Sequence, residues 1–208
     1  MSFREKYLSN PGIFGLFKFL IGVNDRTNQI ISDYVQTSNG EIVVDIACGN
    51  GDYSRKLKGV SYLGIDMNPG YIDYAKRNYS KFGDFVCADV AQLNSVLAGR
   101  KIDVVLLIGV LHHLTDSQAT MMLGEIAGCL SENGRVVSVD GVFTPDQGLV
   151  ARLLAAADRG KYVRLVDDHN RILEKHLVIS RSEIREDWLR IPYTHYVCVS
   201  KKRVETDI

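Results

Sequence analysis

The chain has 208 residues, enough for one domain with a sizeable core, and its content of 24% charged and 46% hydrophobic residues is ordinary for a globular protein. Lysine plus arginine and aspartate plus glutamate balance at 25 each, so a net charge of zero provides no general attraction to nucleic acid or to anionic lipid. The four cysteines are far apart and form no C-x-x-C pair, which favours buried free thiols in a reducing compartment and argues against a zinc site.

The first apolar segment, Ile13 to Val23, is interrupted by Lys18 and by two glycines. It is shorter than the run of about 20 apolar residues that a membrane span needs, and no small-residue cleavage site follows it. We therefore expect a cytoplasmic protein without a transmembrane segment, in which residues 1–35 form an N-terminal helical lid. Contact of an amphipathic helix with a membrane surface is the alternative.

Strand and helix patterns then alternate, which predicts βαβ units and a parallel sheet. The predicted strands are Glu41 to Ile46, Ser61 to Ile65, Phe85 to Ala88, Ile102 to Ile108 and Arg135 to Val139. The predicted helices are Asn24 to Val35, a short one at Ser54 to Leu57, Tyr71 to Tyr79 after Pro69, and Asp116 to Leu130 with Thr115 or Asp116 as its cap.

The chain changes character after the fifth predicted strand. Residues 142–176 carry proline, glycine and clustered charges around a helical stretch, Leu149 to Ala157, and we interpret them as a substrate-side insertion within a single domain of residues 1–208. Two closing strands, His176 to Ser180 and Tyr193 to Ser200, are predicted to pair as a hairpin.

A glycine-rich turn follows the first predicted strand, in the sequence V-V-D-I-A-C-G-N-G-D-Y-S of residues 43–54. Such a turn lets the backbone approach a ligand closely. A fingerprint for NAD or FAD would place a third glycine where Ser54 stands, so the turn argues modestly against a dinucleotide.

Three acids stand near the ends of three successive strands, beside this turn. Asp45 is suited to accept hydrogen bonds from an ammonium group, Asp66 to accept both hydroxyls of a ribose, and Asp89 to accept a bond from an adenine amino group between the apolar walls of Met67 and Val90. Each acid alone is also explained as a helix cap or turn residue. Together they are better explained by one ligand at the carboxyl edge of the sheet.

These residues resemble the class I methyltransferases that depend on S-adenosylmethionine. D-I-A-C-G-N-G is similar to motif I of that family, Y-L-G-I-D-M-N to motif II, C-A-D-V to motif III and I-G-V-L-H-H-L to motif IV. L-S-E-N-G-R-V is similar to the family's L-x-P-G-G stretch, with Glu132 and Asn133 in place of proline and glycine. The resemblance covers roughly residues 40–140.

The resemblance implies an α/β fold, a Rossmann-like, doubly wound sheet of seven strands, mostly parallel with an antiparallel last strand, and helices on both faces. It implies S-adenosylmethionine as the cofactor and S-adenosylhomocysteine as the product. Asp45, Ala47 and Gly49 would then hold the methionine part, Asp66 the ribose, Asp89 and Val90 the adenine, while Ile108 and Gly109 would back the sulfonium.

Two adjacent histidines, His112 and His113, follow the fourth strand at the same edge. A histidine is a natural base for a hydroxyl acceptor near pH 7. We favour His113 over His112, because similar methyltransferases carry a histidine in the position just before Leu114. Packing beneath the adenine, or capping of the helix that starts at Asp116, is the alternative for either side chain.

The acceptor side is expected to involve Arg159, Tyr162 and Arg164, because loops after the fifth strand commonly cover the acceptor in this family and arginine grips carboxylates and phosphates. A solvated helix end explains them equally well. Tyr193 or His195 would reach the same cleft, or belong to the core. The segments Y-L-S-N-P-G-I-F, D-R-G-K-Y-V-R and R-I-P-Y-T-H resemble stand-alone methyltransferases of bacterial polysaccharide gene clusters, which implies a small-molecule acceptor such as a sugar hydroxyl.

Other functions remain as alternatives. A nucleobase methyltransferase is disfavoured, because I-G-V-L stands where that class has [N/D]-P-P-[Y/F]. A quinone, lipid or other natural-product methyltransferase shares the same core. A dehydrogenase is opposed by Ser54 and by the acid pattern. A protein that binds S-adenosylmethionine as a regulator, without turnover, is the non-enzymatic alternative.

Overall fold

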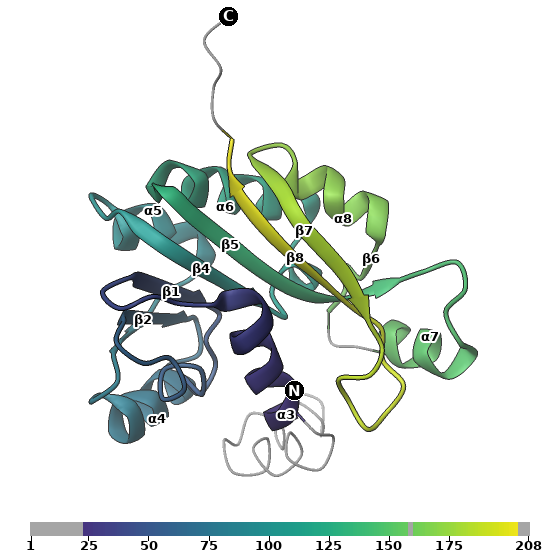
Figure 1. Cartoon of the computed structure of the whole chain (residues 1–208), viewed down its shortest axis with the longest axis horizontal. Coiled ribbons are helices and arrows are strands. Elements are labelled where there is room, and N and C mark those ends of the chain that lie inside the picture. Colours follow the sequence, from purple (N-terminus) through teal and green to yellow (C-terminus); the bar gives the residue numbers. More distant parts are fainter. Residues whose placement is uncertain (1–22, 158–159, 204–208) are drawn as a thin grey trace, which may run out of the picture.

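The computed structural model describes residues 23–157 and 160–203. Their strands form one sheet in the order β3-β2-β1-β4-β5-β8-β7, and the short β6 pairs with β5 (Figure 1). The strands are β1 Ile42–Ile46, β2 Ser61–Asp66, β3 Asp84–Cys87, β4 Ile102–Ile108, β5 Leu130–Phe143, β6 Arg164–Leu165, β7 Leu177–Arg185 and β8 His195–Lys202. Strands β1 to β5 are parallel, and β8 is antiparallel to both β5 and β7. This confirms the predicted fold class and the predicted closing hairpin.

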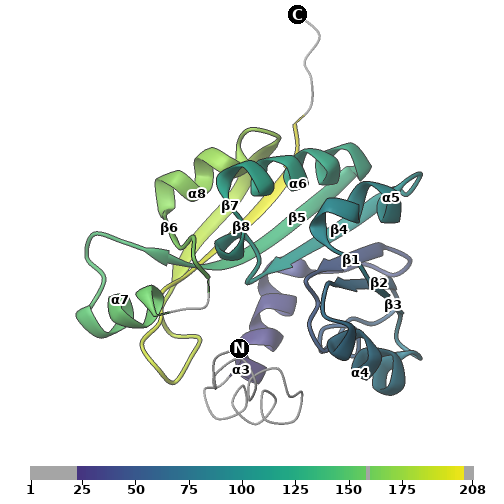
Figure 2. The same ribbon diagram turned by 180° about the vertical axis from the view of Figure 1, so that it is seen from behind.

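Helices cover both faces of this sheet, as Figures 1 and 2 show from opposite sides. The helical elements are α3 Val23–Ile30, the π-helical η1 Ile31–Val35, α4 Pro69–Tyr79, η2 Val90–Gln92, α5 Leu93–Leu97, η3 Leu111–His113, α6 Asp116–Cys129, α7 Leu149–Ala156 and α8 Val166–Leu173. None of the helices in the described part of the chain is long and apolar enough to cross a membrane.

The alternation of side chains along the central strands divides the core in two. In β4, Val105 and Leu107 pack with α5, α6 and α8, whereas Val104 and Leu106 pack with α3, η1 and α4. All four side chains are fully buried, as expected for a parallel strand with helices on both sides. The continuous apolar run of β4 is therefore what places it at the centre of the sheet.

Local capping fixes where two helices begin. The side chain of Asn68 accepts hydrogen bonds from the backbone N–H groups of Gly70 and Tyr71, and Pro69 occupies the first position of α4. Thr115 and Gln118 form a reciprocal capping box at the start of α6. Both helices start next to the carboxyl edge of the sheet, so these caps also define the rim of that edge.

The predicted helix at Ser54 to Leu57 is wrong, because the structure has only consecutive turns there. The buried hydroxyl of Ser54 donates to the Gly51 carbonyl oxygen at 2.7 Å and thereby competes with regular helical bonding. The fifth strand also differs from its prediction. It begins at Leu130 and passes through an irregularity in pairing before Arg135.

The segment of residues 142–176 contains more regular structure than its sequence indicated. Helix α8 follows β6 and buries His169, Ile172 and Leu173 against the sheet. Helix α7 instead lies beyond the end of β5, where Arg152 contacts the Phe143 ring, and beside the loop between β7 and β8 (Figures 1 and 2). Of the expected N-terminal lid, residues 1–22 lie outside the described residues, and the rest forms α3 and η1.

Candidate cofactor and acceptor site

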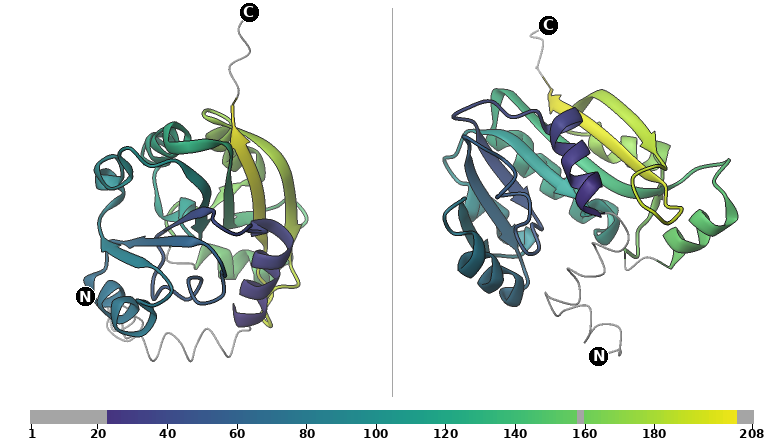
Figure 3. Two further views of the ribbon diagram at one scale, coloured as in Figure 1. Left: turned by 60° about the vertical axis from the view of Figure 1, so that its left-hand side comes forward. Right: turned by 60° about the horizontal axis from the view of Figure 1, so that its bottom comes forward.

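A cavity of about 740 Å³ opens at the carboxyl edge of the parallel strands, the end that Figure 3 (right) turns toward the viewer. Its size lies in the range of roughly 300–1,000 Å³ that is typical of small-molecule sites. The cavity brings together every cofactor residue expected from the sequence and one of the two histidines. These lining residues are Asp45, Ala47, Gly49, Asp66, Met67, Asp89, Val90, Ile108, Gly109 and His113.

The glycine-rich turn is built from three left-handed residues. Ala47, Gly49 and Gly51 have φ angles of 58°, 55° and 76°. Gly51 additionally lies so close to the Phe85 ring that a Cβ would stand 2.6 Å from Cε1. The turn therefore needs glycine at Gly51 for both reasons, and its curvature exposes the backbone of Ala47 and Gly49 to the cavity.

Asp66, the last residue of β2, is held firmly at the cavity wall. Its Oδ2 accepts a hydrogen bond from the backbone N–H of Gly49 at 2.9 Å, and its Oδ1 accepts one from Asn68 at 2.8 Å. Each carboxylate oxygen has a second lone pair. The carboxylate is therefore oriented by the protein while it keeps acceptor capacity for two hydroxyl groups.

Asp45 is 1% exposed and its carboxylate accepts a 2.6 Å hydrogen bond from the Tyr62 hydroxyl. Burial, and next the Asp45 carboxylate, raise the pKa of Tyr62 well above its ordinary value. The phenol therefore stays protonated and donates, which fixes Asp45 as an acceptor at the base of the turn.

Asp89 is a helix cap that also lines the cavity. Its Oδ1 accepts a hydrogen bond from Ala91 at 3.0 Å, and Gln92 reaches back to its backbone N–H, so Asp89 caps η2. The residue also lines the cavity, opposite Met67, whose side chain is 69% exposed. A large apolar side chain this exposed is available as a wall for a flat ring.

Sequence reasoning missed the basic and hydroxyl groups on the α3 side of the cavity, where Arg26, Thr27, Tyr53 and Lys56 are lining residues. Burial raises the pKa of Tyr53 to about 12. Within the described part of the chain, the Nε of Arg26 is buried without a hydrogen-bond partner. A buried cationic donor without a hydrogen-bond partner indicates an anionic ligand group. The only signal for it in the sequence was an arginine in the predicted helix before motif I.

Arg26 also connects the cavity to the C-terminal hairpin. Its Nη1 lies 3.1 Å from Nε2 of His195, the first residue of β8. Burial, and next the charge of Arg26, hold the pKa of His195 well below its ordinary value. His195 is therefore neutral and accepts from Arg26, in a ring cluster with Trp188 and Tyr193.

The two adjacent histidines separate in the structure. His113 is exposed and lines the cavity. His112 is buried, and its Nδ1 lies 2.7 Å from Oδ1 of Asp140 in β5. The rings remain neighbours, with centroids 4.2 Å apart. Asp140 was not predicted, although it is a fourth acid at the carboxyl end of a parallel strand.

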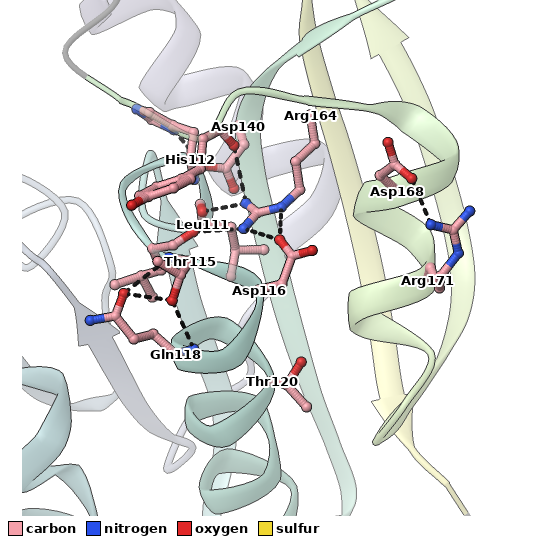
Figure 4. A network of polar contacts seen from close by, with 12 residues as sticks. Leu111, His112, Thr115, Asp116, Gln118, Thr120, Asp140, Arg164, Asp168 and Arg171 are labelled. Atoms are coloured by element: carbon pink, nitrogen blue, oxygen red, sulfur yellow. Dashed lines mark hydrogen bonds and ion pairs between the residues drawn. The ribbon is translucent and has the colours of Figure 1, made fainter.

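Arg164 occupies a structural position instead of facing a ligand (Figure 4). Its guanidinium donates to Asp116 and to the carbonyl oxygens of Leu111, Leu114 and Tyr162. These bonds use all five of its N–H groups. We therefore assign Arg164 to the framework, contrary to the expectation that it grips the acceptor.

Of the other two expected acceptor residues, the structure describes only Tyr162, which is not among the residues that line the cavity. Tyr162 is 39% exposed, and its backbone N–H donates to the carbonyl oxygen of His112 at 3.0 Å. Arg159 lies outside the residues that the structure describes. The backbone of Tyr162 is thus attached to η3.

Comparison with known proteins gives a family match over the core of this site. Residues 43–134 match the family model described as a methyltransferase domain. An uncharacterized methyltransferase of Geobacillus sp. (strain WCH70) is 23% identical over 182 residues, which cover 83% of this chain and 84% of that protein.

Solved structures share the fold at low sequence identity. The N-methyltransferase NodS of Bradyrhizobium japonicum, in complex with S-adenosylhomocysteine, has a TM-score of 0.71 and 16% identity, covering 96% of both chains. A TehB-like SAM-dependent methyltransferase of Corynebacterium glutamicum has a TM-score of 0.61 and 20% identity, covering 87% of this chain and 96% of its own. The matched residues 43–134 contain the glycine turn, the acids that end β1 to β3, and both histidines.

Proposed function

Because this chain is a class I methyltransferase that depends on S-adenosylmethionine, we propose that its carboxyl-edge cavity holds this cofactor and delivers the methyl group to a hydroxyl of a small molecule, such as a sugar or a polysaccharide precursor. The observation that carries the cofactor assignment is the convergence of all nine motif residues on one cavity. The sulfonium of S-adenosylmethionine supplies an already activated methyl group, so the protein has to align an acceptor with it.

The residues of the cavity fit the parts of this cofactor. Asp66 presents an oriented carboxylate for the ribose hydroxyls, and Asp89 with Met67 and Val90 forms the adenine end. Asp45 at the opposite end is an anchored acceptor for an ammonium group. The buried and unpartnered Nε of Arg26, among the described residues, supplies a donor for a carboxylate.

The nature of the acceptor rests on two kinds of support. The flanking segments resemble methyltransferases of polysaccharide gene clusters, and His113, which lines the cavity, is a side chain that can take a proton from a hydroxyl. A nitrogen acceptor is the second candidate, because NodS, which has this fold over 96% of both chains, is named an N-methyltransferase.

Calorimetric titration with S-adenosylhomocysteine tests the cofactor site without an acceptor. We expect micromolar binding that Asp66→Ala weakens by about 10- to 100-fold, since a hydrogen bond to a charged group contributes roughly 1.5–3 kcal/mol. Asp73→Ala, which removes an exposed acid from α4, is the matched control and should bind normally. Equal affinity of both variants would remove Asp66 from the site, and binding of NAD in place of S-adenosylhomocysteine would overturn the proposal.

A further inference from the structure

Arg26 in α3 contacts the C-terminal hairpin of β7 and β8 at His195. Its Nη1 lies 3.1 Å from Nε2 of His195, although the two residues are 169 positions apart, and α3 lies beside β8 in Figure 3 (right). Arg26 also lines the cavity, and its Nε is buried without a hydrogen-bond partner in the described part of the chain. One N–H group of the guanidinium is thus held by the hairpin, while another is left for a ligand.

The direction of this hydrogen bond follows from the chemistry of the two side chains. A guanidinium has only donors, so Nε2 of His195 must accept from Arg26 and the ring proton stays on Nδ1. Burial, and next the charge of Arg26, hold the pKa of His195 well below its ordinary value, although the Asp187 carboxylate acts in the opposite direction. The ring is therefore neutral near pH 7 and remains an acceptor for Arg26.

The His195 ring is itself held in place. It is almost completely buried, and its centroid lies 5.5 Å from that of Trp188 and 4.9 Å from that of Tyr193. Its backbone pairs with both β5 and β7. An arginine side chain has many rotamers, so an interaction that orders it in advance reduces the entropy that is lost when a ligand binds. His195 therefore gives Arg26 a fixed point on the sheet.

A second donor lies on the same wall of the cavity. The hydroxyl of Tyr53 is buried, and within the residues that the structure describes it has no hydrogen-bond partner. The charge of Arg26 acts on this group, and burial raises the pKa of Tyr53 to about 12, so the phenol keeps its proton. Two buried donors without acceptors, one of them cationic, fit a carboxylate. In S-adenosylmethionine the methionine part carries the carboxylate.

We propose that His195 is a positioning residue for the cofactor, which holds Arg26 so that its Nε binds the carboxylate of the methionine part together with the Tyr53 hydroxyl. This inference rests on the proposed function, in which Arg26 is a donor, and adds the residue of the last strand that orients it. His195 is not among the described residues that line the cavity, so it acts through Arg26. The C-terminal hairpin thereby takes part in the selection of the cofactor.

Calorimetric titration with two matched ligands tests this role. Decarboxylated S-adenosylhomocysteine keeps the adenosine, the thioether and the amino group of S-adenosylhomocysteine and lacks only the carboxylate. We expect the unaltered protein to prefer S-adenosylhomocysteine by about 10- to 100-fold, as for the loss of a hydrogen bond to a charged group. Arg26→Met should abolish most of this preference, because the cationic donor is lost.

Replacement of His195 separates orientation from packing. His195→Phe keeps an aromatic ring beside Trp188 and Tyr193 but removes the acceptor for Arg26. We expect it to weaken S-adenosylhomocysteine by about 10-fold and the decarboxylated ligand by less than about 2-fold. His195→Gln, whose amide oxygen can accept from Arg26, should recover most of the affinity.

A double-mutant cycle tests whether His195 acts through Arg26. In an Arg26→Met background, His195→Phe should weaken S-adenosylhomocysteine no further, because the group that it orients is already absent. His176→Phe is the matched control, since His176 directly precedes β7 at the opposite end of the hairpin, and it should change neither affinity.

Nitrogen-15 NMR of the histidine rings tests the contact in the unaltered protein, even if the His195 variants do not fold. We expect the neutral ring of His195 to carry its proton on Nδ1, and the signal of Nε2 to shift in Arg26→Met, because a donor is lost. A proton on Nε2 of His195 would overturn the inference.

Three binding results would also overturn it. They are equal affinity of the unaltered protein for the two ligands, an equal loss for both ligands in His195→Phe, and a further loss from His195→Phe in the Arg26→Met background. In each case S-adenosylhomocysteine still binds to the unaltered protein, so the proposed function stands. Failure of the folded, unaltered protein to bind either ligand would contradict the cofactor assignment, and this inference with it.

Discussion

At the scale of single residues, the site depends on side chains whose conformation is set by a neighbour. Asp66 is oriented by two backbone N–H groups, Asp45 by the Tyr62 hydroxyl and His112 by Asp140. A ligand that meets such groups finds them already in place, so less conformational entropy is lost on binding. Ala47 differs from these side chains because its unusual feature lies in the backbone. It adopts a left-handed conformation although it is not a glycine.

Ala47→Gly should stabilise the protein. An alanine at φ 58° costs about 1–2 kcal/mol, and the greater freedom of glycine in the unfolded chain offsets roughly half of that. We expect the free energy of unfolding in urea to rise by about 0.5–1 kcal/mol. Ala127→Gly, within the regular helix α6, provides the control and should lower it by about 1 kcal/mol. Destabilisation by both variants would show that Ala47 carries no backbone strain.

At the scale of elements, the end of β5 connects β8, β6 and η3 at the carboxyl edge of the sheet. The strand continues past its predicted end at Val139, because Asp140 and Gly141 pair with Tyr196 and His195 of β8 while Val142 pairs with β6. This extension places Asp140 beside η3. Arg164, in β6, connects this region to α6 and η3. It donates to Asp116 at the start of α6 and to the carbonyl oxygens of Leu111 and Leu114, the first residue of η3 and the residue that follows it.

Arg164→Met should destabilise the fold through this junction. The variant keeps the apolar stem but leaves the carbonyl oxygens of Leu111 and Leu114 without their buried donor, at about 1–3 kcal/mol for each unsatisfied group. We expect a total loss of about 2–6 kcal/mol in urea unfolding. Arg171→Met breaks a surface pair with Asp168 and should cost less than about 1 kcal/mol. A loss for Arg164→Met as small as that of the control would contradict the framework role.

At the scale of the whole molecule, the sheet separates two apolar cores, and polar groups are concentrated at its carboxyl edge. His169 is a buried residue of α8, and His195 lies at the start of β8 near α3. Both are almost completely buried. Because burial lowers the pKa of each ring, the folded protein binds fewer protons than the unfolded chain in mildly acidic solution.

Stability should therefore fall as the pH falls below the ordinary histidine pKa of 6.5. The contribution of each ring to the free energy of unfolding is fully present above that pH. It is lost as the pH falls toward the lower pKa that the ring has in the folded protein, with a slope of at most about 1.4 kcal/mol per pH unit for each group. Urea unfolding at pH 7.5, 6.5 and 5.5 measures this slope. His169→Gln should make it shallower, and the partly exposed His176→Gln serves as the control for the loss of one histidine. An unchanged slope in His169→Gln would contradict the assignment.

Much of the fold, and the gathering of the candidate cofactor residues around one cavity, could be predicted because the information is local in the sequence. Apolar runs of four to seven residues gave the strands β1 to β4, and the capping residues Asn68 and Thr115 gave two helix starts. The three acids Asp45, Asp66 and Asp89 each stand at or near the carboxyl end of a strand, and parallel strands bring these ends to one edge whatever the details of packing. The sequence by itself thus determined the α/β architecture and the side of the sheet where the cofactor residues gather.

Only the tertiary structure decided which neighbours these residues have. Adjacent positions in η3 send His113 to the cavity and His112 to Asp140, a choice that depends on a strand 28 positions away. Arg164 became a framework residue because the acceptors for its five N–H groups come from η3, α6 and its own segment. Helix α8 was missed because its pattern is short and acquires its apolar partners only when it packs on the sheet. Contacts between distant segments have no local sequence pattern, and in this protein they decide which side chains become neighbours at the carboxyl edge.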